Sequence, residues 1–143
     1  MPLVVLETES TVVGTATVDI VVPYTTPQLT RLAVREADAL AAKLPSRIRV
    51  LRLHGVPFPN DLRYPPVALD MLREQARQVA RGINTSEITL VLTRDPEAAL
   101  LKALRPGSIV VIGTKKRWWR TAQERLARLC ERHGYQVALV YSR

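Results

Sequence analysis

Five short apolar runs divide the chain, and each has the length and composition of a strand buried in a parallel sheet. Their residue ranges are 17–22, 47–53, 87–93, 108–112 and 136–141. In the run at 47–53, arginines alternate with apolar residues. This alternation predicts a strand with one wetter face near an edge of the sheet.

Apolar residues at helical spacing fill the intervals between these runs. The predicted helices begin at Pro27, Val67, Pro96 and Thr121. Thr26 is an N-cap before the first of them, and Asp95 caps the third. Thr121 and Glu124 have the spacing of a capping box, so the loop before Thr121 is expected to lie outside the helix.

Strands that alternate with helices predict a parallel sheet with helices on both faces. We expect a single doubly wound α/β domain over residues 17–143, with five parallel strands in the order 3-2-1-4-5. Residues 1–16 are expected to form a short N-terminal arm or an extra strand that adds to a sheet edge. The ligand crevice of such a sheet lies at its switch point, here between residues 23–26 and the loop that begins at Gly113.

Composition narrows the class of protein. The chain has one cysteine, Cys130, which excludes an internal disulfide and fits a reducing cytosol. No apolar run is long enough to span a bilayer, and the start of the chain lacks the pattern of a secretory signal. The formal charge is +8, of which +6 falls in residues 113–143. A basic end of this kind attracts phosphates, nucleic acid or an anionic membrane, or is simply a solvated helix face.

The loop from Lys115 to Arg120 reads Lys-Lys-Arg-Trp-Trp-Arg, and two interpretations of it stay open. In the first, the cations hold phosphate and Trp118 or Trp119 stacks on a base. In the second, one tryptophan packs over the end of the core and the other packs against a partner subunit. The cations then keep the surrounding surface hydrated.

Candidate catalytic and metal-binding residues are few. His54 and His133 belong to different elements, and neither has a Cys or carboxylate at a metal-ligand spacing. Cys130 falls on the apolar stripe of its helix and is interpreted as a small core residue. We therefore expect no metal, no catalytic residue and no enzyme, with a weak ATPase as the open alternative.

The order of these elements and several short motifs resemble the universal stress protein family. The resemblance covers residues 17–142 and rests on Ile20 to Pro23 before a turn and helix, on Asp95-Pro96, on Ile109 to Thr114, and on the closing run from Val137 to Tyr141. It implies a small cytoplasmic α/β protein that acts in stress responses, commonly a homodimer paired through its last strand. Some members bind ATP through an acidic residue after the first strand and a Gly-x2-Gly-x9-Gly-Ser/Thr motif after the fourth.

This sequence departs from the ATP-binding pattern. Thr25 stands where the acidic residue would be, and Gly113 matches the first motif glycine. Lys116 and Leu126 occupy the places of the other two glycines. The expected cofactor is therefore none, with ATP possible only if the loop has been rebuilt.

Three hypotheses follow. The first is a non-catalytic stress-protein-like regulator without classical ATP binding. The second is a member that binds ATP or AMP through the rebuilt basic loop, and the third, less favoured, is a basic module that binds nucleic acid. Protein partners other than a second copy stay unknown. The candidate nucleotide- or anion-binding residues are Thr25, Thr26, Gly113, Thr114, Lys115, Lys116, Arg117 and Thr121.

Overall fold

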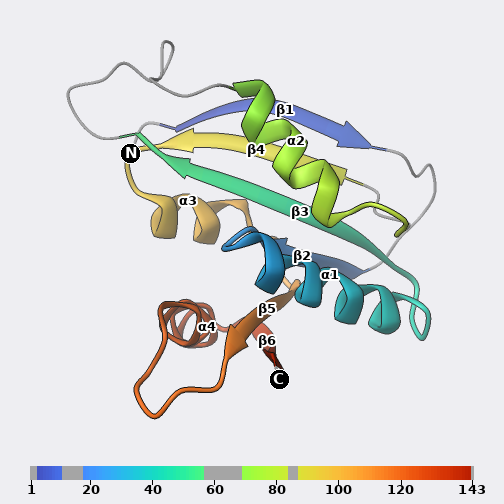
Figure 1. Ribbon diagram of the computed structural model, residues 1–143, viewed down its shortest axis with the longest axis vertical. Coiled ribbons are helices and arrows are strands. Elements are labelled where there is room, and N and C mark those ends of the chain that lie inside the picture. Colours follow the sequence, from blue (N-terminus) through green and yellow to red (C-terminus); the bar gives the residue numbers. More distant parts are fainter. Residues whose placement is uncertain (1–2, 11–17, 57–68, 84–86, 143) are drawn as a thin grey trace.

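The computed structural model describes residues 3–10, 18–56, 69–83 and 87–142 (Figure 1). Its elements are β1 (Leu3–Ser10), β2 (Val18–Pro23), α1 (Pro27–Ala41), β3 (Ser46–Gly55), α2 (Leu69–Val79), β4 (Glu87–Thr93), α3 (Pro96–Ala103), β5 (Ile109–Lys115), α4 (Ala122–Arg132) and β6 (Gln136–Ser142). Within this part of the chain, no helix combines the length and the apolar character that crossing a membrane requires.

The strands form one sheet in the order β1-β4-β3-β2-β5-β6. The five strands from β2 to β6 run parallel, so the predicted order 3-2-1-4-5 is confirmed. β1 runs antiparallel to β4, with Leu3 opposite Thr93 and Ser10 opposite Glu87. Residues 3–10 of the predicted N-terminal segment are therefore an extra strand on the chain's own sheet, while residues 11–17 lie outside the described residues.

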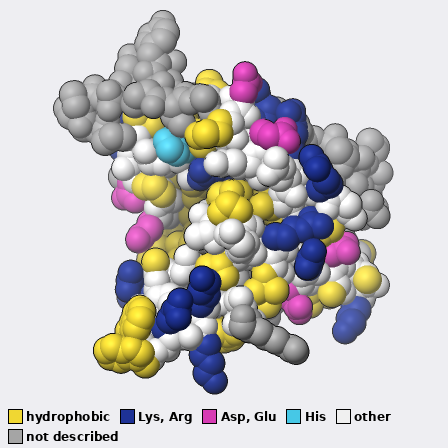
Figure 2. All heavy atoms as spheres, viewed as in Figure 1, with side chains coloured by type: hydrophobic (Ala, Val, Ile, Leu, Met, Phe, Trp, Pro, Cys, Tyr) yellow, Lys and Arg dark blue, Asp and Glu magenta, His cyan; other side chains and the backbone are white. Residues whose placement is uncertain are grey.

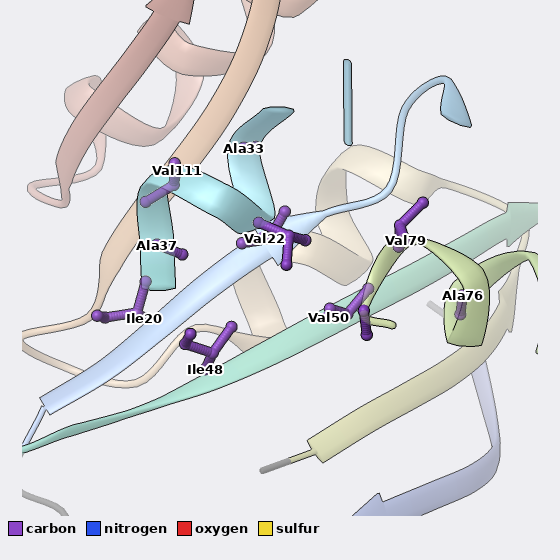
Figure 3. Packing of buried hydrophobic residues seen from close by; sticks show 11 residues of the cluster. Ile20, Val22, Ala33, Ala37, Ile48, Val50, Ala76, Val79 and Val111 are labelled. Atoms are coloured by element: carbon purple, nitrogen blue, oxygen red, sulfur yellow. The ribbon is translucent and has the colours of Figure 1, made fainter. Parts of the chain in front are cut away.

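Helices cover both faces of the sheet. On one face, α1 and α2 pack on apolar residues of β2 and β3. Figure 3 shows Val22 and Val50 of these strands among the small side chains of Ala33 and Ala76, which let the helices approach the sheet closely. On the other face, α3 and α4 cover a second cluster formed by β2, β3, β4 and β5. This arrangement leaves the loops that follow β2 and β5 to form one end of the domain.

The prediction of a wet face near an edge was wrong for β3. β3 lies in the middle of the sheet, between β4 and β2. Arg49 is only 5% exposed; its Nη2 lies 3.0 Å from Oδ2 of Asp19 and donates a 2.7 Å hydrogen bond to the carbonyl of Ala103. Arg47 lies 3.8 Å from the same carboxylate. The buried guanidinium is thus paired, as a charge inside a protein must be.

Candidate functional site

The strand order brings the two loops of the predicted crevice together. β2 and β5 are neighbours in the sheet, with Val21 opposite Val110, so both strands end at the same edge. The chain turns into α1 at Pro27 and into α4 at Ala122. This edge is the switch point at which ligands of doubly wound sheets bind.

Gly113 is a glycine because β5 passes close to the first turn of α1. A Cβ atom at this position would collide with the carbonyl oxygen of Leu29 and would lie 3.1 Å from its carbonyl carbon. The missing side chain therefore permits helix and strand to pack. The sequence analysis matched Gly113 to the first glycine of the family motif and named it a candidate anion-binding residue, but the packing against Leu29 explains the residue without a ligand.

Thr114 and Thr121 join the two ends of the basic loop. Thr114 is fully buried, and its Oγ1 lies 2.6 Å from Oγ1 of Thr121. Thr121 also caps α4: its Oγ1 accepts a 3.1 Å bond from the Glu124 amide, and its own amide donates a 3.0 Å bond to Oε1 of Glu124. The predicted capping box is confirmed.

The carboxylate of Glu124 thus lies at the N-terminus of α4, where the partial positive charge of a helix favours an anion. The pKa of Glu124 is lowered from its ordinary value of 4.5, chiefly because the backbone N–H of Thr121 donates to the carboxylate. Burial opposes this shift, whereas the Thr121 hydroxyl, Arg120 and Tyr141 add to it. The Glu124 carboxylate is therefore an anion, contributed by the chain itself, at the N-terminus of α4.

Thr25 and Thr26 shape the turn after β2. Thr26 caps α1, since its Oγ1 accepts a 3.2 Å bond from the Leu29 amide. The Thr25 amide donates a 2.9 Å bond to Oγ1 of Thr30. Both predicted site residues therefore take part in hydrogen bonds that fix the local backbone.

A hollow of about 330 Å³ lies beside Thr25. Its other walls are Glu97 of α3 and the first residues of α4, namely Ala122, Gln123, Arg125 and Leu126. A volume of this size is at the lower end of the range for small-molecule sites. Lys115, Lys116 and Arg117 are not among the lining residues, so the structure does not bring them together with Thr25 around this space.

The basic loop is open to solvent from Lys115 to Arg120. Trp118 is 91% exposed and Trp119 is 51% exposed, so the proposal that one tryptophan seals the core of this chain was wrong. The two rings meet edge to face, with centroids 5.1 Å apart and planes at 89°. The guanidinium of Arg117 lies 5.9 Å from the centre of the Trp119 ring, within the range of a cation–π contact.

Sequence reasoning missed a second hollow, of about 480 Å³, between α1 and α2. Its lining residues are Tyr24, Pro27, Gln28, Arg31, Gln75, Gln78 and Val79. Arg52 lies over the Tyr24 ring at 4.4 Å and donates a 3.2 Å bond to Gln75 Oε1. Burial raises the pKa of Tyr24 and lowers that of Arg52. No pattern in the sequence indicated this hollow, because its lining residues come from two segments far apart in the chain.

His54 lies in β3, and His133 and Cys130 lie at the C-terminal end of α4. Burial lowers the pKa of His54, and the nearby Arg52 charge lowers it further. His133 caps α4, with its Nδ1 2.9 Å from the Leu129 carbonyl. Cys130 is buried, and burial raises the pKa of its thiol to about 11, which keeps it protonated and unreactive at neutral pH. Among the described residues, no three His, Cys, Asp or Glu side chains form a group that could hold a metal ion.

Comparison with known proteins places the fold. No family model matches the chain, and no curated protein matches it. The chain is similar to the crystal structure of a universal stress protein in complex with cAMP, with a TM-score of 0.55 and 18% identity over 90% of this chain and 100% of that one. It is also similar to a universal stress protein from Archaeoglobus fulgidus, with a TM-score of 0.54 and 15% identity over 87% of this chain and 94% of that one. The chain therefore has a doubly wound α/β fold of the universal stress protein type.

Proposed function

We propose that this protein is a non-catalytic regulator of the universal stress protein type, active in the cytoplasm, that does not bind ATP in the classical way. The observation that carries the proposal is the capping box at α4. The Glu124 carboxylate accepts from the Thr121 amide at 3.0 Å and from the Thr121 hydroxyl at 3.1 Å. The negative charge of the Glu124 carboxylate would repel a triphosphate at the N-terminus of α4.

The surroundings of the helix start support the same proposal. Gly113 is accounted for by its contact with Leu29, and Thr26 by its cap on α1. The exposed cations of the loop do not line the hollow beside Thr25. Lysine and arginine side chains that are not gathered around a cavity attract anions from a distance, but they do not form a phosphate-binding site.

A thermal melt of the full chain with and without Mg-ATP tests the proposal. We expect no shift in melting temperature at millimolar Mg-ATP. A ligand at one hundred times its dissociation constant would add about 2.7 kcal/mol to the free energy of unfolding, a shift of several degrees for a domain of this size. A clear shift that disappears in Lys115→Ala/Lys116→Ala, but persists in the control Lys43→Ala/Lys102→Ala, would overturn the proposal.

The second candidate is a nucleotide-binding protein that uses the rebuilt basic loop. One observation favours it: a universal stress protein of similar fold was crystallised in complex with cAMP. In this chain, the hollow beside Thr25 lies where β2 and β5 end. The melt is therefore repeated with AMP and cAMP. A shift with a monophosphate nucleotide that is lost in Lys115→Ala/Lys116→Ala supports this candidate. A shift that is lost in Thr25→Trp, which would fill the hollow, but kept in the lysine variant would locate the nucleotide in the hollow and contradict the use of the loop.

We further propose that the protein forms a homodimer through β6. β6 is the last strand of the sheet, and Val137, Ala138, Leu139 and Val140 are each only partly buried. Tyr141 is 48% exposed. An edge strand with apolar side chains on both faces is well suited to pair with a second copy.

A further inference from the structure

The tip of the β5–α4 loop carries the largest exposed apolar side chains of the described residues. Trp118 is 91% exposed and Trp119 is 51% exposed. Figure 1 shows this loop extending away from the sheet, and Figure 2 shows hydrophobic side chains protruding at the same corner with Lys and Arg side chains beside them. Two neighbouring solvent-exposed indoles form an apolar surface patch, and such exposed apolar patches often mark binding sites.

The tryptophans lie within a strongly positive region. Residues 115–132 contain seven Lys or Arg and two Glu, a net charge of +5. Lys115, Lys116 and Arg117 make no ion pair within the described part of the chain. On α4, Arg125, Arg128 and Arg132 are exposed at positions three and four apart, so they extend the positive charge along one helix face. The chemistry that complements this surface is anionic.

The loop is also held in place before any partner arrives. The 2.6 Å contact between the Thr114 and Thr121 hydroxyls joins its two ends. The Arg125 side chain donates a 3.1 Å bond to the Arg120 carbonyl, which ties the end of the loop to α4. A surface held in this way loses less conformational freedom on binding.

The arrangement of the two rings separates the possible anionic partners. Proteins that bind single strands of nucleic acid stack successive bases on aromatic rings along a positively charged groove. Trp118 and Trp119 stand at 89° to one another, on a projecting loop. Perpendicular rings do not offer parallel faces to successive bases. They do suit the interface of a bilayer, where indoles lie among the headgroups and flanking Lys and Arg reach the lipid phosphates.

We infer that the loop from Lys115 to Arg120 docks the protein on the surface of an anionic lipid bilayer. Trp118 and Trp119 enter the headgroup region, and the cations of the loop and of α4 contact the lipid phosphates. The docking is peripheral and reversible, because two indoles and a basic patch bind a bilayer far more weakly than a spanning helix does. This inference concerns the outer surface of the loop and is independent of what the crevice binds.

Sedimentation with vesicles of phosphatidylcholine, with and without 30 mol % phosphatidylserine, tests the inference on the full chain. We expect binding to the anionic vesicles and a much smaller fraction bound to the neutral ones. Lys115→Ala/Lys116→Ala should lower the partition coefficient roughly tenfold or more, since each surface cation contributes to attraction by anionic lipid. The control Lys43→Ala/Lys102→Ala, which removes two exposed lysines elsewhere, should bind as the unchanged protein does.

Intrinsic fluorescence gives an independent measurement, because the only two tryptophans of the chain are both in this loop. Anionic vesicles should shift the emission to shorter wavelength as the indoles leave water. Trp118→Ala should weaken vesicle binding while Trp119 still reports, and Met71→Ala, which removes a side chain 50% exposed on α2, should leave binding unchanged. No binding to anionic vesicles would overturn the inference. So would an emission shift with a single-stranded oligonucleotide in the absence of any shift with vesicles.

Discussion

Gly113 shows how one residue is constrained by a segment far away in the chain. It lies in β5, and its missing side chain leaves room for the carbonyl of Leu29 in the first turn of α1. The same glycine matches the first position of a family phosphate motif. Its contact with Leu29 means that it would be required here whether or not a phosphate binds.

Gly113→Ala is therefore expected to destabilise the fold. The added methyl group would push α1 away from β5, and overpacking of this kind costs about 1–3 kcal/mol of unfolding free energy. Urea denaturation gives the measurement. Gly55→Ala is the comparison: its Cβ would meet the side chain of Pro96 at 3.3 Å, a milder contact than that with the carbonyl of Leu29, so it should cost less stability. Equal stability of the two variants would show that the contact with Leu29 is not a constraint.

At the scale of elements, the junction between β5 and α4 carries several of the hydrogen bonds that define the candidate site. The capping box orders the start of α4, places the Glu124 carboxylate there, and helps to hold the exposed loop. Thr121 and Glu124 thus cap the helix, and the proposed absence of classical ATP binding depends on the negative charge that Glu124 places there.

This junction predicts a pH dependence. The folded-state pKa of Glu124 is lower than its ordinary value of 4.5, so the carboxylate stabilises the fold above that value. The stabilisation should be lost as the pH falls through the lower, folded-state pKa. Melting temperatures between pH 7 and pH 3 measure this loss, and Glu124→Gln should show a shallower decline than the unchanged chain. Identical profiles for the two proteins would contradict the role given to the carboxylate.

Removing the cap itself should have a cost at neutral pH. Thr121→Ala loses the hydroxyl that accepts from the Glu124 amide, and replacement of a threonine N-cap by alanine costs about 1 kcal/mol. Thr121→Ser keeps the hydroxyl and should retain most of the stability. If both variants lost the same amount, the methyl group and not the cap would be the stabilising feature.

At the scale of the whole molecule, the two ends of the sheet differ. β1 and β6 each have one neighbour in the described sheet, but β1 pairs antiparallel with β4 whereas β6 pairs parallel with β5. Because apolar residues on both faces of β6 are partly exposed, β6 is the edge through which we propose that a second copy pairs.

Light scattering after size exclusion should therefore give twice the chain mass of 16.0 kDa. Tyr141→Lys should shift the mass towards the monomer, because a lysine on an edge strand opposes pairing with another strand. Gln78→Lys places the same charge on exposed α2 and should leave the dimer unchanged. A wild-type mass of 16.0 kDa at all concentrations would show that β6 does not pair in solution.

Much of the fold could be predicted from local patterns. The apolar runs and the caps at Thr26, Asp95 and Thr121 located every parallel strand and helix start except that of α2, whose predicted beginning at Val67 lies outside the described residues. The candidate site was predicted less well. The pattern identified the loop, its charges and the capping box of Thr121 and Glu124, but it did not indicate that the lysines would lie outside the lining of the hollow beside Thr25.

The sequence by itself determined the order and kind of the elements, the parallel sheet and the position of the basic loop, because these depend on periodicities and caps within a few residues. Only the tertiary structure decided which charges and side chains find partners. Arg49 pairs with Asp19, 30 residues away, and β3, predicted to have a solvent-exposed face near an edge, lies in the middle of the sheet. β1 joins β4 across most of the chain, and both tryptophans face solvent. These outcomes depend on contacts between distant segments, which no local pattern encodes.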